Sequence, residues 1–163
     1  MTALADGGLT IDLPSGWDGQ IRAAGQASAS ARRVAPEGAT EPMTGEGLVL
    51  HAGNFALPPE RGDYGSGAVE VMGGSHVLVC LLEHERAAAS ASLFAREGVP
   101  RLAASMFSPE TMQRAIAGMA GTQHFFQVAG RPFCLYVVVG SWRTRGPLVA
   151  LADRVTSTIR IAA

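Results

Sequence analysis

Two stretches of the chain are apolar at consecutive positions, and we expect both to form central β-strands. One is Phe133 to Val139, the second half of a predicted hairpin over 121–141, and the other is His76 to Leu82. A strand that is apolar on both faces lies in a sheet that is covered on both sides. The chain is therefore predicted to be organised around a sheet with these two strands in its middle.

Three weaker patterns predict further strands. Leu9 to Leu13 alternates between apolar and polar residues and ends at a Pro-Ser-Gly turn, so we expect it to pair with the next strand, Gln20 to Ala24. Gly47 to Phe55 is a third strand, which ends before two prolines because proline cannot continue a hydrogen-bonded ladder.

Helical spacing is clearest at the end of the chain, where Gly146 and Pro147 precede a periodic apolar face. The residues of that face are Leu148, Leu151, Ala152, Val155 and Ile159. A serine N-cap at Ser108, followed by Pro109 and Glu110, predicts a helix that reaches Met119. A shorter helix is expected over Ala87 to Glu97.

These elements predict a single α/β domain over residues 1–163, of the α+β type. We expect one mainly antiparallel sheet of about five to six strands, because hairpins join neighbouring strands, with helices covering both faces. The stretch 25–45 combines Ala, Ser, Gly and Pro without periodicity and is expected to be a long loop.

Composition narrows the class of protein. Of the 163 residues, 47% are hydrophobic and 17% are charged, and the net charge is −1. This balance gives no indication of a nucleic-acid partner, and no apolar run approaches the ~20 residues of a membrane helix. We expect a cytoplasmic location, because the first residues lack the pattern of a secretory signal. Cys80 and Cys134 lie within apolar strands and are expected to be buried thiols.

Both ends of the chain resemble PsbP-like domains. The stretch LTIDLPSGWDGQI is similar to the opening strand and Pro-Gly-Trp turn of that family, and LVALADRVTSTIRI is similar to its closing helix. The resemblance covers these two stretches only. It implies an antiparallel sheet between helices and a binding or assembly module rather than an enzyme, and it supplies no site residues.

The glycine-rich loop 61–67 carries the candidate binding residues. Arg61, Asp63, Tyr64 and Ser66 lie close together on it, and loops of this kind often carry recognition. Gly65-Ser66-Gly67 lacks the spacing of a nucleophile elbow, and a chain without lysine has no P-loop lysine. The four histidines lack metal-ligand spacing, so neither a metal nor another cofactor is predicted.

Phe125 and Phe126 alternate in the hairpin, so either one becomes an interface residue if its side of the sheet is uncovered. The residues favour a non-catalytic binding or assembly module with a protein partner or a homo-oligomeric state. The alternative is a small hydrolase or transferase with a site near Glu83, His84 and the loop 61–67. A ligand carrier with a cavity between sheet and helices stays open as a third reading.

Overall fold

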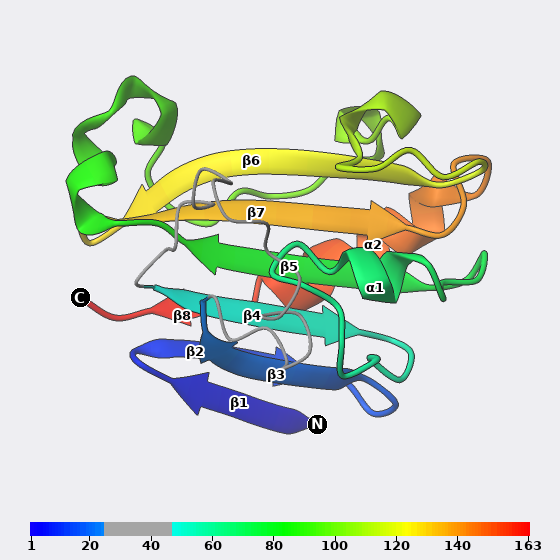
Figure 1. The fold of residues 1–163 in the computed structure, drawn as a ribbon, viewed down its shortest axis with the longest axis horizontal. Helices are drawn as coiled ribbons and strands as arrows, with labels where there is room; N and C mark the ends of the chain where they lie inside the picture. Colours follow the sequence, from blue (N-terminus) through cyan, green and yellow to red (C-terminus); the bar gives the residue numbers. More distant parts are fainter. Residues whose placement is uncertain (25–46) are drawn as a thin grey trace, which may run out of the picture.

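The computed structural model describes residues 1–24 and 47–163, and in this part the chain is mainly β (Figure 1). Its strands form a three-stranded sheet in the order β1-β2-β8 and a five-stranded sheet in the order β3-β4-β5-β7-β6. The strands are β1 Thr2–Asp6, β2 Leu9–Leu13, β3 Asp18–Ala23, β4 Leu48–Gly53, β5 Val77–Glu83, β6 Ala120–Val128, β7 Arg131–Val139 and β8 Arg160–Ile161. The helices are α1 Ser66–Val69 and α2 Arg145–Thr156.

The prediction of a single sheet covered by helices on both faces is wrong, and so is the α/β sandwich that it implied. Residues 1–24 and 47–163 form two sheets, and the structure is 21% helical. One face of the five-stranded sheet, here called the α2 face, packs against α2 and against β2 of the smaller sheet. The opposite face, here called the loop face, is covered by the single turn of α1 and by loop residues such as Met112 and Met119.

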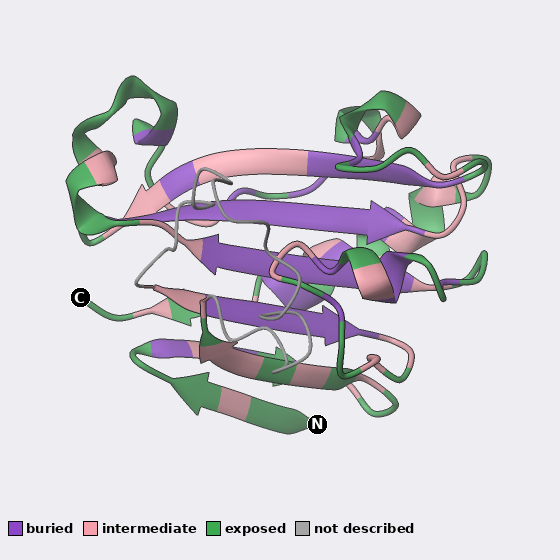
Figure 2. Ribbon diagram, in the orientation of Figure 1, coloured by how far each residue is buried: buried purple, intermediate pink, exposed green. Residues whose placement is uncertain are grey.

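The expected central strands β5 and β7 are confirmed (Figure 2). Val79 and Val137 are fully buried in the core of the α2 face, while their chain neighbours Cys80 and Tyr136 are buried in the core of the loop face. Burial of apolar surface stabilises a fold by ~25 cal/mol per Å², so strands that are buried on both faces contribute from each face.

The expected pairing of Leu9–Leu13 with the following strand is wrong. β2 pairs with β1 and β8, whereas β3 pairs with β4 of the other sheet. A hairpin turn at Gly7 and Gly8, both with positive φ, brings β1 beside β2. With β1 on one side and β8 on the other, β2 has no free edge for β3, so the turn at Pro14 to Trp17 carries the chain from one sheet to the other.

Of the three expected helices, only the terminal one forms a helix of several turns, α2, and it ends at Thr156, before Ile159 of the expected face. The segment after Ser108 is a 3-10 turn at Pro109–Thr111 that ends at extended Met112. Met112 and Met119 both pack on the loop face, and the backbone N–H of Gln113 donates to the Tyr136 hydroxyl instead of a helical carbonyl. Ala87 to Glu97 forms two short 3-10 turns, Arg86–Ser90 and Ser92–Phe94. Tertiary contacts therefore override the local helical pattern in both places.

The expected loop 25–45 lies outside the described residues. Within residues 1–24 and 47–163, no helix has the length and hydrophobicity needed to cross a membrane.

Candidate functional site

The predicted binding loop lies over a row of side chains on the loop face. Gln20, His51, Cys80 and Tyr136 stand opposite one another on β3, β4, β5 and β7. Arg61 reaches into this row and is only 7% exposed. Its Nε donates to Nδ1 of His51 at 2.8 Å, and its two Nη atoms donate to the Pro58 carbonyl oxygen at 2.8 Å and to Gln20 at 2.5 Å.

His51 is the centre of this network, although the sequence pattern marked it only as one of four histidines that lack metal-ligand spacing. Its Nδ1 accepts from Arg61, so Nε2 carries the proton and donates to the Asp63 carbonyl oxygen at 2.7 Å. Burial, aided by the guanidinium groups of Arg61 and Arg22, lowers the pKa of His51 to about 4 against the opposing effect of Asp63. The ring is therefore neutral at pH 7 and ties the loop to β4.

The other residues of the predicted binding set also contact their own fold. The Asp63 carboxylate pairs with Arg22 at 3.1 Å. The Tyr64 carbonyl accepts from the Cys80 thiol at 3.5 Å, and the Tyr64 ring meets Tyr136 edge-on with 6.0 Å between centroids. Ser66 lines a cavity of about 20 Å³, which has room for about one water molecule. The structure therefore gathers the predicted residues in a packed loop.

Glu83, part of the alternative catalytic site, is engaged in an ion pair with little exposure. Its carboxylate accepts from Nε and Nη2 of Arg131 at 2.7 and 3.0 Å and from the Leu48 backbone N–H at 3.1 Å. Burial raises the pKa of Glu83, but the hydrogen bonds from Arg131 and Leu48 outweigh it, so the net shift is downward. Arg131 also donates to the carbonyl of Ala162 at 2.9 Å, which holds the end of the chain.

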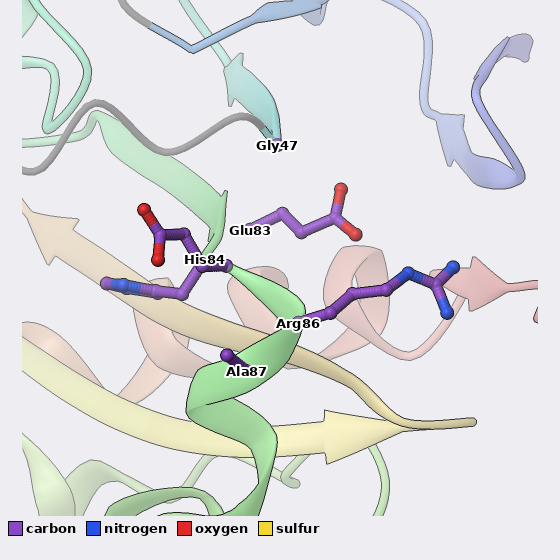
Figure 3. Close-up of a pocket in the computed structure, with 6 residues that line it drawn as sticks. Gly47, Glu83, His84, Arg86 and Ala87 are labelled. Carbon is purple, nitrogen blue, oxygen red and sulfur yellow. The ribbon is translucent and has the colours of Figure 1, made fainter.

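An open hollow of about 410 Å³ lies where β5 ends, lined by Gly47 and by residues 83–87 (Figure 3). Figure 3 shows the Glu83 and His84 side chains pointing to opposite sides, as strand alternation requires. His84 turns toward Phe94 and Phe125, and burial lowers its pKa. None of the residues lining this hollow belongs to the loop 61–67, so the hollow does not bring the alternative catalytic residues together.

The two phenylalanines predicted as interface residues have different environments. Phe126 is fully buried on the α2 face and stacks on Phe133, with 5.7 Å between ring centroids. Phe125 is half-buried on the loop face, where it forms an aromatic cluster with His84 and Phe94. Only Phe125 has a surface that a partner could contact.

Phe125 also lies on the edge strand β6, which is only partly covered. At one end, Gly121 exchanges both backbone hydrogen bonds with Ser108, and at the other Gln127 bonds to the backbone of Arg96 and Gly98. Strand alternation then directs the N–H and C=O of Gln123 and Phe125 outward as well. In the described part of the chain, these four groups have no backbone partner. We call positions 122–126 the edge window.

The sequence offered no signal for the edge window, because it depends on which strands pair. Glu97 and Ser108 occupy the neighbouring strand position at its two ends, and residues 98–107 leave the edge between them and pass behind the sheet (Figure 1). Two exposed apolar residues lie in the turns that precede these contacts along the chain, Leu93 (56% exposed) before Glu97 and Met106 (38% exposed) before Ser108.

Groups suited to metal binding or covalent catalysis are sparse in residues 1–24 and 47–163. No cluster of three or more His, Cys, Asp or Glu side chains there could hold a metal. Both cysteines are buried, and burial raises the pKa of Cys134 to about 11 and that of Cys80 still further. Neither thiol is therefore a nucleophile at pH 7.

No protein-family model, curated protein or solved structure matches this chain. The resemblance of its two ends to PsbP-like domains therefore stays a prediction.

Proposed function

We propose that this protein is a non-catalytic binding module that takes up a short extended segment of a partner protein as an added strand beside β6. The observation that carries the proposal is the edge window, where the outward N–H and C=O groups of Gln123 and Phe125 have no backbone partner among the described residues. Adding a strand to a sheet edge gives affinity through main-chain hydrogen bonds.

The length of the window limits what can bind. The residues opposite Gly121 and Gln127 belong to this chain, and the parallel bridge of Glu97 with Gln127 puts Arg96 opposite position 126. A guest, meaning the bound segment, therefore has at most the positions opposite 122–125. Six strand steps between the two ends correspond to about 20 Å. A second copy of β6, at nine residues, would collide with Ser108 and Glu97. A guest must therefore be short and must turn away from the sheet at both ends.

The side chains around the window favour a protein guest. Phe125 offers apolar surface beside the open backbone groups, and Leu93 and Met106 are exposed apolar residues in the turns that precede Glu97 and Ser108. The free edge of β1, at Ala3 and Ala5, has only small side chains at its outward positions. Exposed apolar side chains next to unpaired backbone are typical of interaction sites.

The experiment selects peptides from a phage-displayed library of seven-residue sequences on the full chain. A selected peptide is then titrated into ¹⁵N-labelled protein. We expect the amide signals of Gln123 and Phe125 to shift. The variant Gln123→Pro removes one outward N–H and should weaken binding about five- to tenfold, the value of one hydrogen bond. Gln123→Ala, which loses the same side chain and keeps the N–H, should bind like the parent.

Proline is tolerated in an edge strand when its nitrogen faces away from the sheet, so Gln123→Pro should fold. Ala5→Pro on the edge of β1 is the control for a proline at another sheet edge and should leave binding unchanged. Three results would contradict the proposal: no peptide selected at this edge, equal binding by the two Gln123 variants, or slow exchange of both amides in the free chain.

A further inference from the structure

We infer that the guest runs antiparallel to β6 and carries an apolar residue opposite Phe125 followed by an acidic residue opposite His124. This inference rests on the proposed strand addition, and it names the class of segment that the edge window would select.

The direction follows from the outward backbone groups. An antiparallel guest residue opposite Phe125 exchanges both hydrogen bonds with it, and the guest residue opposite Gln123 does the same. Three guest residues then satisfy all four groups. A parallel guest satisfies the same groups only by reaching from position 122 to position 126, next to Ser108 and Glu97. The short window therefore favours the antiparallel direction.

The apolar position follows from the aromatic cluster on the loop face. Directly opposed residues of neighbouring strands lie on the same face, with Cβ atoms ~5 Å apart. The guest residue opposite Phe125 therefore lies beside the Phe125 ring, which meets Phe94 edge-on with 5.7 Å between centroids. An apolar guest side chain would bury surface of both rings, whereas a charged one would lose hydration there.

The acidic position follows from the α2 face of the window. His124 lies on this face, with Nε2 at 2.9 Å from the Thr122 hydroxyl. Glu97 stands opposite Gln127, which faces the loop side, so the preceding residue, Arg96, faces the α2 side with His124. Burial is the main cause that lowers the pKa of His124, and the nearby charge of Arg96 lowers it further.

Arg96 is exposed, and its guanidinium has no carboxylate partner in the part of the chain that the structure describes. A guest carboxylate opposite His124 would supply one. The two faces of the window thus favour different guest side chains, apolar on the loop face and acidic on the α2 face. Read along the guest, the apolar residue comes immediately before the acidic one.

The test titrates the peptide acetyl-Thr-Val-Glu-Thr-Thr-amide into the ¹⁵N-labelled full chain up to millimolar concentration, with the amides of Gln123 and Phe125 as the readout. Three matched peptides accompany it: one with Glu replaced by Lys, one with Val replaced by Ser, and one with the sequence reversed. We expect the parent peptide to bind best and the Lys peptide about fivefold more weakly, the upper range for an exposed ion pair.

The variant Arg96→Glu should reverse that preference, so that the Lys peptide binds better than the Glu peptide. A structural role of Arg96 would weaken both peptides alike. Equal binding of the Glu and Lys peptides, or a selected library peptide without an acidic residue, would overturn this inference and leave strand addition standing. If neither these peptides nor any library peptide moves the two amides, strand addition itself is contradicted.

Discussion

Arg61 and His51 are ten residues apart in the sequence, and in the structure Nε of Arg61 donates to Nδ1 of His51 at 2.8 Å. This single bond fixes the tautomer of the histidine and satisfies a buried charge. It also holds the loop that contains Arg61 against β4. The residues predicted as a binding loop are therefore part of the fold's own hydrogen-bond network.

Removing Arg61 should destabilise the protein. Arg61→Ala leaves Nδ1 of His51 and Oε1 of Gln20 without their donor, and we expect the free energy of unfolding to fall by about 2–4 kcal/mol. Chemical denaturation measures this loss. The control is Arg114→Ala, whose partner Glu70 lies on the surface, with side-chain exposures of 72% and 55%. That change should cost under about 0.5 kcal/mol, and equal losses would contradict the role of Arg61.

The stability of the protein should fall on mild acidification. The pKa of His51 is about 4 in the folded state and 6.5 for an unperturbed histidine. The unfolded chain therefore binds the proton first, so stability is full above about pH 6.5 and declines as the pH drops toward 4. The loss approaches about 3 kcal/mol, at 1.36 kcal/mol per pKa unit.

The variant His51→Gln tests the origin of this decline, because Gln offers an acceptor to Arg61 and a donor to Asp63 without titrating. Denaturation curves at pH 7, 6, 5 and 4 should show a much flatter dependence for the variant. An unchanged dependence would assign the decline to other groups.

Removing one partner of the ion pair between Glu83 and Arg131 should destabilise the protein. The two side chains are 10% and 6% exposed, so Glu83→Leu leaves a guanidinium without its carboxylate in a buried site. We expect a loss of about 3–5 kcal/mol. The double variant Glu83→Leu with Arg131→Met should recover part of it, since no buried charge is left and only the Leu48 N–H and the Ala162 carbonyl lose their partners. A double variant less stable than the single one would contradict this account.

Phe125 and Phe126 should respond differently to truncation. Phe126→Ala opens a cavity in the core of the α2 face and should cost about 3–5 kcal/mol. Phe125 is only half-buried, so Phe125→Ala should cost about 1 kcal/mol while removing the aromatic surface beside the edge window. Thermal unfolding measures both changes, and similar losses would place Phe125 in the core as well.

The turn between β6 and β7 should accept a stabilising substitution. Ala129 has a φ of 53° and Gly130 a φ of 76°. A left-handed conformation costs a residue such as alanine about 1 kcal/mol, whereas asparagine and glycine adopt it readily. Ala129→Asn creates the Asn-Gly pair that such hairpins favour and should raise the free energy of unfolding by about 0.5–1 kcal/mol. A loss of stability in denaturation experiments would be inconsistent with this turn geometry.

The sequence by itself determined the local, strongly patterned elements of this protein. The hairpin of β6 and β7, the central strand β5 and the terminal helix α2 follow from periodicity, because burial of their apolar positions leaves one arrangement for each. Cys80 and Cys134 are buried as their apolar neighbours predict.

The tertiary structure decided what depends on pairing between distant segments. Local alternation identifies a strand and not its partner, so neither the two-sheet arrangement nor the placement of β3 beside β4 could be predicted from it. The helical pattern from Met112 to Met119 gave way to packing against Tyr136 and its hydroxyl. The edge window is the feature that the sequence predicts least. It depends on the contacts of Glu97 and Ser108 with β6, and on the segment between them leaving the edge of the sheet.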